Sequence, residues 1–296
     1  MDTRQLEYFV AVAEELNFTR AAARLFAVQS TVSAGIRSLE TELGAALFER
    51  STKRVSLTAA GARVLPEARA AIEAVDRVRS AAAENSHDIR GRLRVGIFTN
   101  LDYLDLPGLF GEFHERYPLV DLQLTASASG STGFAEDVRR GRVDLAFMGL
   151  AAQDLAGFQV VELTRTEFVA VVPSAHPLAA RSHVDLADLT SGPWVDTPAG
   201  FGNRVILDRA LAERGLSRTV GVQVSELGAV ADFVAAGLGI AVIPVVAYSP
   251  APGTATVPLE PSVSWSLSAI TRPGPSPAIA ALLDLMAERF TAARRA

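Results

Sequence analysis

The hydrophobic pattern of this 296-residue chain changes its period near residue 90, and that change constrains the fold most. Before it, apolar residues recur three and four positions apart, as they do on one face of a helix. After it, short apolar runs typical of strands alternate with helical stretches. A length near 300 residues suits about two domains of roughly 150 residues. The sequence therefore predicts a small, mainly helical domain followed by a larger α/β domain built on a parallel sheet.

Three short helices are predicted at the start of the chain. The first has one apolar face, made of Leu6, Phe9, Val10 and Ala13. The second is expected to begin with Thr19 as its N-cap, and a break at residues 26–28 follows. The third has its apolar stripe at Val32, Ile36, Leu39 and Leu43, with Gly44 just past its end as the C-cap.

A hairpin and a long helix come next. The runs LFER and RVSL flank three polar residues and predict two short strands. Thr58 is then expected to cap a helix over roughly residues 59–86, with Pro66 inside it. Small and apolar residues recur in it at spacings of four and three: Val64, Ala68, Ala71, Val75, Val78 and Ala82. This heptad pattern predicts a dimer helix, since no other part of the chain is evident to cover it.

The third helix has the layout of a helix that enters the major groove of DNA, with polar side chains opposite its apolar stripe. Gln can bond adenine, and Arg can reach guanine or phosphate. The hairpin offers basic residues to the DNA backbone or minor groove. The predicted DNA contacts are Gln29, Ser30, Thr31, Ser33, Arg37, Arg50, Lys53 and Arg54. The alternative for any one of them is an ordinary surface residue.

Charge along the chain agrees with this prediction. The net charge of −5 argues against nucleic acid only if it is spread evenly. Residues 16–63 hold seven basic and three acidic side chains, and the acidity lies mostly after residue 90. The pattern suits a small basic DNA reader attached to an acidic domain.

Several classes of protein are excluded or disfavoured. The chain has no cysteine, so disulfides and cysteine-based zinc sites are impossible, and no metal or cofactor is expected. It has no nucleophile elbow, P-loop or H-E-x-x-H motif, and Gly237 and Gly239 lack the third glycine of a dinucleotide loop. An enzyme is therefore disfavoured. A transporter's solute-binding protein would fit only the last two thirds. A secretory signal and a membrane span are both lacking, so a cytoplasmic location is expected.

The sequence resembles the LysR-type transcriptional regulators. The resemblance is specific from Leu6 to Gly61, through LEYFVAVAEELNFTRAAARLF, VQSTVSAGIRSLETELGAALFER and RVSLTAAG. Weaker agreement extends over nearly the whole chain, through RGRLRVGIF, GRVDLAF, VPSAHPLA and VAAGLGIAVIP. One departure is Ser30, which stands where the family often has proline in the first turn of the recognition helix.

The resemblance implies an architecture and partners. It implies a winged helix-turn-helix over residues 1–58, a dimerisation helix over 59–90, and an effector-binding domain over 91–296 that resembles periplasmic binding proteins. Its lobes are placed at 91–162 with 268–296, and at 163–267, with hinges near 163–167 and 267–270. The implied partners are a pseudo-palindromic DNA operator, a small-molecule effector, a second copy in a dimer or tetramer, and RNA polymerase.

Effector contacts are predicted in loops that follow strands, because ligands of α/β lobes sit where strand ends face helix starts. The candidates are Thr99, Asn100, Ser129, Met148, Phe201, Asn203 and Ser225. Helix capping or core packing is the alternative role for each of them. Family members that bind carboxylates often have a basic residue near the position of Met148. Its absence here speaks against a strongly anionic effector unless Arg204 substitutes for it.

Overall fold

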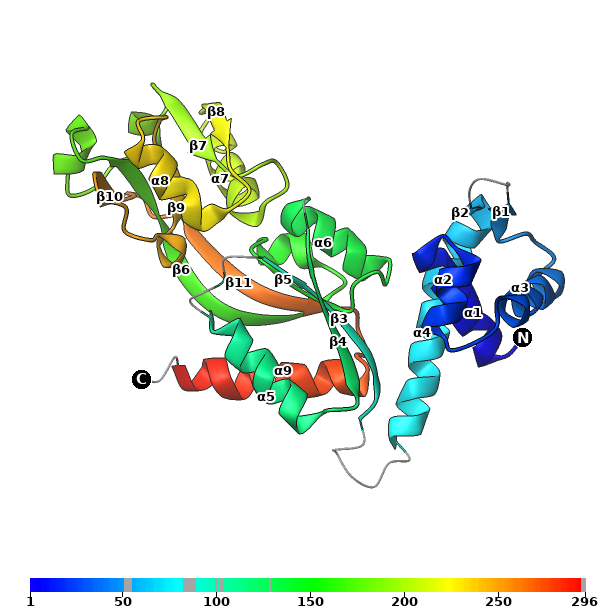
Figure 1. Cartoon of the computed structure of the whole chain (residues 1–296). Helices are drawn as coiled ribbons and strands as arrows, with labels where there is room; N and C mark the ends of the chain where they lie inside the picture. Colours follow the sequence, from blue (N-terminus) through cyan, green and yellow to red (C-terminus); the bar gives the residue numbers. More distant parts are fainter. Residues whose placement is uncertain (51–54, 82–88, 99–100, 102–103, 128, 294–296) are drawn as a thin grey trace. The chain divides into compact units, whose positions relative to one another are not determined.

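The computed structural model describes residues 1–50, 55–81, 89–98, 101, 104–127 and 129–293 (Figure 1). Two compact units are distinguished: Met1–Gly91 with Arg140–Arg142, and Arg92–Arg139 with Val143–Ala296. We call them the N-terminal and C-terminal units. Among the described residues, no helix is long and apolar enough to cross a membrane.

The N-terminal unit begins with α1 (Thr3–Glu15), α2 (Phe18–Arg24) and α3 (Gln29–Leu43). Apolar faces of all three helices form one core, with Phe9, Val12 and Ile36 fully buried in it. The break at residues 26–28 and the left-handed C-cap at Gly44 are confirmed. Two details of the prediction were wrong. Asn17, not Thr19, caps α2, because its side-chain oxygen accepts the N–H groups of Thr19 and Arg20. Leu43 lies outside the core, since its side chain is exposed.

The predicted hairpin is also confirmed. Strands β1 (Phe48–Arg50) and β2 (Val55–Leu57) pair in antiparallel fashion. The carboxylate of Glu40, on α3, accepts the backbone N–H of Leu47 at 2.8 Å, which ties α3 to the start of β1. Thr58 caps the next helix, because its hydroxyl accepts the N–H of Gly61 at 2.9 Å.

Helix α4 (Ala59–Ala81) corrects the prediction that its heptad seam has nothing in its own chain to cover it. Ala68 is buried in the core of the N-terminal unit, and Val64 and Ala71 pack against that core. Val75 is half-buried and Val78 is 71% exposed, while Ala82 lies outside the described residues. Only the later part of the seam is therefore left for a partner.

The C-terminal unit is built on β3 (Gly91–Ile97), β4 (Val120–Ala126), β5 (Leu145–Met148), β6 (Gln159–Pro173), β9 (Ala241–Pro244), β10 (Thr254–Pro258) and β11 (Ser264–Thr271). They form a seven-stranded sheet in the order β10-β6-β11-β5-β3-β4, with β9 paired to β6. A separate parallel pair joins β7 (Pro193–Asp196) and β8 (Thr219–Gln223). The prediction of a parallel sheet is only partly right. β3 and β5 run parallel, but β11 runs antiparallel to both β5 and β6.

The long strands β6 and β11 pass from one lobe of this unit into the other (Figure 1). The first part of β6 pairs with β11, and its second part pairs with β9 and β10. The β6–β11 register shifts between Leu267 and Ser268, inside one of the two predicted hinge segments. The early part of β6 and strand β7 were not anticipated. Neither shows the strict apolar alternation on which strand prediction depends.

Helices cover the sheet on both lobes. They are α5 (Leu106–Arg116), α6 (Gly130–Arg139), α7 (Gly202–Ala212), α8 (Val230–Ala235) and α9 (Pro277–Ala293). Phe134 and Val138 of α6 pack against β5 and β11 in one core, and Val230 and Val234 of α8 pack against β6, β7 and β9 in another. The alternation of strands with helices that the sequence predicts after residue 90 is therefore confirmed.

Candidate functional site

Helix α3 presents two distinct faces in the N-terminal unit. Val32, Ile36 and Leu39 are fully buried against α1 and its neighbours. The side chains of Gln29, Ser30, Thr31 and Arg37 are exposed. Ser33 corrects the prediction, because it is only 9% exposed and lies on the inner side of the helix. The helix therefore offers a polar outer face on a rigid apolar base.

The start of α3 lacks a side-chain cap. Its N-cap is Val28, whose apolar side chain can accept no hydrogen bond and is 69% exposed. Phe26, two residues earlier, has a positive φ of 50° and is fully exposed. Thr31 donates its backbone N–H to the carbonyl of Val28 at 3.0 Å. The N–H groups of Gln29 and Ser30 are thus those left for another acceptor, and oxygen atoms of a phosphate suit that position.

A shallow groove runs between α1 and α3. It is lined by Asp2, Arg4, Gln5, Tyr8, Ser30, Thr31, Ala34, Gly35 and Ser38. Gln5 of α1 donates its side-chain amide to the hydroxyl of Ser38 on α3 at 3.0 Å. The two helices approach closely because residue 35 is glycine, and a methyl group there would collide with the ring of Tyr8. The outer face of α3 is thereby extended by polar groups of α1.

Part of the basic excess counted in this region is internally paired. Arg20 pairs with Glu15, and Arg24 pairs with both Glu14 and Glu15. The positive charges of these two arginines are therefore compensated by carboxylates of the same unit. Arg50 ends β1, but its side chain is not described, and Lys53 and Arg54 lie outside the described residues.

Glu14 joins α1, α2 and α4 through two arginines. Its carboxylate contacts Arg24 at 2.5 Å and Arg69 at 2.9 Å, and Arg69 is buried. Burial alone would raise the pKa of Glu14, but the hydrogen bonds and charges of Arg24 and Arg69 outweigh it and hold that pKa below its ordinary value. The ion pair fixes the long helix to the three-helix core.

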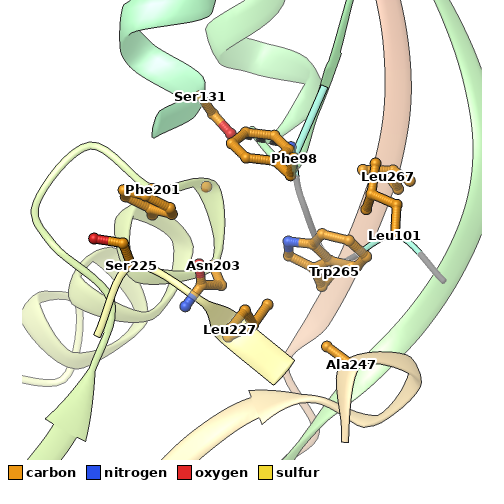
Figure 2. A pocket seen from close by; sticks show the side chains of 12 residues that line it. Phe98, Leu101, Ser131, Phe201, Asn203, Ser225, Leu227, Ala247, Trp265 and Leu267 are labelled. Carbon is orange, nitrogen blue, oxygen red and sulfur yellow. Dashed lines mark hydrogen bonds between the residues drawn. The ribbon is translucent and has the colours of Figure 1, made fainter. Parts of the chain in front are cut away.

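The C-terminal unit holds a pocket between its lobes (Figure 2). It encloses about 430 Å³ of space not filled by atoms, part of it open to solvent. Its lining comes from many separate segments: Phe98, Leu101, Ser131, Gly149, Phe201, Gly202, Asn203, Ser225, Leu227, Ala247, Trp265 and Leu267. The lining is mostly aromatic and aliphatic with a few polar groups, as is usual for small-molecule sites.

The lobes touch beside this pocket. The backbone N–H of Thr132, in α6, donates to the carbonyl of Gly200 at 3.1 Å. Arg209 of α7 donates to both oxygens of Asp154 at 2.7 and 2.9 Å. The first contact joins the start of α6 to the segment just before α7, and the second joins the later part of α7 to the short 3-10 helix Ala152–Leu155 of the other lobe.

Asn203 is positioned by a buried polar network. Its side-chain oxygen accepts the hydroxyl of Thr197 at 3.2 Å, and its amide lies 3.5 Å from Asp196. Asp196 also faces Arg218 at 2.5 Å, and both side chains are almost fully buried. Burial raises the pKa of Asp196 although the charge of Arg218 and the N–H of Thr197 oppose it.

Comparison with known proteins decides the family. A family model described as the LysR substrate binding domain matches residues 86–291. A second, described as a bacterial regulatory helix-turn-helix protein of the lysR family, matches residues 3–62. The chain belongs to the LysR family of transcriptional regulators. The sequence prediction of a winged helix-turn-helix joined to a two-lobed α/β domain is confirmed, as is the prediction that this is not an enzyme.

Individual LysR-family relatives agree. The regulator is 38% identical over 244 residues to the HTH-type transcriptional regulator ShiR of Corynebacterium glutamicum, with 82% of each chain covered. It is 32% identical over 245 residues to the transcriptional dual regulator GltC of Bacillus subtilis, with 82% of this chain and 81% of GltC covered.

Solved structures of full-length LysR-family proteins are also similar. A full-length OxyR variant from Pseudomonas aeruginosa superposes with a TM-score of 0.76 at 26% identity, covering 97% of this chain and 95% of OxyR. CbnR, solved in complex with its target DNA, gives a TM-score of 0.57 at 26% identity, covering 98% and 100% of the two chains. These findings support DNA binding and oligomeric assembly for the regulator.

The residues predicted to contact the effector differ in where the structure places them. Phe201, Asn203 and Ser225 line the pocket. Ser129 is exposed and is not among the lining residues, and Thr99 and Asn100 lie outside the described residues. Met148 was a wrong choice, because it is fully buried in the core between α6 and β11. Gly149, the next residue, is the one that reaches the pocket.

Sequence reasoning missed most of the pocket of the regulator. Trp265 and Leu267 lie within β11 and Phe98 directly follows β3, and none of the three was among the predicted effector contacts. Trp265 gave one usable signal, since indole N–H groups in buried positions usually need a partner. No pattern along the chain could have placed it opposite Asn203.

Proposed function

We propose that this LysR-family regulator binds a pseudo-palindromic DNA operator through α3 and that a small molecule in the pocket between the lobes modulates that binding. The observation that carries the DNA half is the division of α3 into a fully buried apolar face and an exposed polar face. A recognition helix needs both, because the groove-facing side chains must be held rigidly from behind.

Within this proposal each DNA-facing residue has a role. Gln29, Ser30 and Thr31 stand at the start of α3, where side chains reach base edges and uncapped backbone N–H groups meet phosphate. Arg37 lies two turns further on and binds guanine or phosphate. Arg50, Lys53 and Arg54 of the hairpin bind the DNA backbone or the minor groove.

We further propose that the later part of α4 joins two copies. Val78 is apolar and 71% exposed. Val75, three residues before it on the same seam, is half-buried. An exposed valine on a helix seam favours a partner helix. The proposed assembly is a dimer, or a tetramer built from two dimers, in the cytoplasm, that contacts RNA polymerase. We keep the proposed domains: the DNA-binding domain is residues 1–58, the dimerisation helix is 59–90, and the effector-binding domain is 91–296. The lobes of the last are 91–162 with 268–296, and 163–267.

Gel-shift titration of the full chain on its own upstream DNA, with shuffled DNA as competitor, tests operator binding. Specific binding should weaken steeply with salt, because phosphate contacts release counterions. Arg37→Ala should weaken specific binding by about tenfold or more, from the roughly 1–3 kcal/mol of a base contact. Arg63→Ala, an exposed arginine on α4, is the matched control and should change little. Equal loss on all sequences would show that Arg37 contacts only phosphate.

Sedimentation tests the assembly. Val78→Asp should shift the full chain toward monomer, whereas Ala70→Asp, at another exposed position of α4, should not. An unchanged mass for Val78→Asp would contradict the role given to the seam.

A further inference from the structure

The lining of the pocket between the lobes has no charged side chain among the described residues. Its polar groups are the hydroxyls of Ser131 and Ser225, the amide of Asn203 and the indole N–H of Trp265. The nearest arginines on α7 are engaged elsewhere: Arg204 donates to the carbonyl of Thr197, and Arg209 pairs with Asp154. An ionised ligand would lose its hydration here without gaining a counter-charge.

The start of α6 compensates only in part. The N–H of Thr132, the third residue of this helix, is taken by the carbonyl of Gly200. One of the N–H groups that make a helix start attractive to anions is therefore already used.

Trp265 points to the kind of group that the pocket accepts. It is 5% exposed, and its indole nitrogen has no hydrogen-bond partner among the residues that the structure describes. Figure 2 shows that nitrogen on the side of the ring facing into the pocket, toward Asn203 and Phe201. The other tryptophan, Trp194, donates its indole N–H to the carbonyl of Leu189 at 2.8 Å. A buried donor left unpaired destabilises the fold, so an acceptor supplied by a ligand would be favoured at Trp265.

Gly149 lets the indole of Trp265 pack close to the backbone of this segment. A methyl group at this position would collide with the indole nitrogen of Trp265. The N–H of Gly149 donates to the hydroxyl of Ser131 at 3.3 Å, which leaves the hydroxyl proton of Ser131 free to donate in turn. Two donors thus flank a residue without a side chain, and Phe98 and Phe201 stand nearby as apolar walls.

We propose that the effector is an uncharged, ring-sized molecule whose carbonyl or other acceptor oxygen lies in this pocket and accepts the indole N–H of Trp265. Its ring packs among Phe98, Phe201 and Leu267. This inference rests on the proposed role of the pocket as the effector site.

Three probes of one ring size separate charge from hydrogen bonding: benzamide is neutral with an acceptor, benzoate is charged, and toluene has no acceptor. Binding of each to the full chain is measured by calorimetric titration. Benzamide should bind about tenfold more tightly than either other probe, since one tenfold step equals about 1.4 kcal/mol, within the usual range of a hydrogen bond.

The variant Trp265→Phe removes the donor and keeps an aromatic ring. It should weaken benzamide binding about tenfold and leave toluene binding unchanged. Trp194→Phe is the matched control, because it removes the indole N–H that lies outside the pocket, and it should leave both affinities unchanged. Circular dichroism confirms that both variants are folded.

The proposal is overturned if benzoate binds as tightly as benzamide, if Trp265→Phe leaves benzamide binding unaltered, or if benzamide does not bind up to its solubility limit. Each of these results leaves the gel-shift result untouched. Loss of operator binding in the gel shift would instead contradict the proposed function while the pocket chemistry stood.

Discussion

Glu14 in the N-terminal unit is a partly buried carboxylate and Asp196 in the C-terminal unit a fully buried one. Both lie beside arginine, yet their pKa values move in opposite directions. Glu14 has two arginines on its two oxygens, and its pKa is lowered. Asp196 is more deeply buried and faces Arg218, which also stacks over Trp194, and its pKa is raised. The charges of Arg218 and Arg204 do not offset the nearly full burial of Asp196, whereas those of Arg24 and Arg69 offset the partial burial of Glu14.

Removing the charge of Glu14 gives the largest expected effect. Glu14→Gln leaves Arg69 buried beside a neutral amide, so the N-terminal unit should lose about 3 kcal/mol of unfolding free energy. Hydrogen exchange of the full chain measures the loss unit by unit. A loss no greater than that of Glu15→Gln, which changes a more peripheral partner of Arg24, would break the comparison.

Asp196→Asn should cost less, about 1 kcal/mol in the C-terminal unit, because the charged form is already disfavoured there. Arg218 keeps its contact with Asp208 at 2.7 Å in this variant. The same exchange measurement applies, now on peptides of β7 and β8. A loss larger than that of Glu14→Gln would reverse the proposed ranking.

Val28→Ser changes the N-terminal unit without touching either carboxylate. A serine hydroxyl can cap the first turn of α3, so this unit should gain about 1 kcal/mol. Exchange should slow in α3 and stay unchanged in the C-terminal unit. Val28→Ala, which supplies no cap, is the control, and an equal gain from it would rule out capping as the cause.

The pH dependence gives the smallest but sharpest contrast. The folded pKa of Glu14 lies below its unfolded value, so its contribution is present above the unfolded pKa and is lost as pH falls through the folded pKa. The folded pKa of Asp196 lies above its unfolded value, so its contribution is present at low pH and is lost as pH rises through the folded pKa. In acid unfolding series, the deficit of Glu14→Gln should grow with rising pH and that of Asp196→Asn should shrink. Slopes of the same sign would contradict the assignment.

The parts that sequence predicted well depend on near neighbours in the chain. The helical period placed Phe9, Ile36 and Leu39 in one core, and Gly44 was recognised because a helix end favours a left-handed residue. Ser33 was misplaced because residues one position from Val32 lie at the edge of the buried stripe, where periodicity is ambiguous.

The pocket could not be predicted in the same way. Ser131, Asn203 and Trp265 come from three separate segments, and their meeting depends on how β6 and β11 run between the lobes. The parallel sheet was predicted from alternation alone, which does not reveal that β11 returns antiparallel beside β5. The heptad seam was assigned wholly to a partner because spacing does not tell which helix covers it.

Helix α4 is continuous from Ala68 to Val78. Ala68 is buried in the core of the N-terminal unit, whereas Val78 is exposed to solvent. Helix α4 is therefore a rigid connection rather than a flexible linker. Any rotation of its C-terminal end turns the three-helix core of the N-terminal unit by the same angle. In the proposed dimer, the angle at which two copies of α4 cross therefore sets the distance and orientation between the two DNA-binding units. A small change in that angle changes how the two units meet the grooves of the duplex.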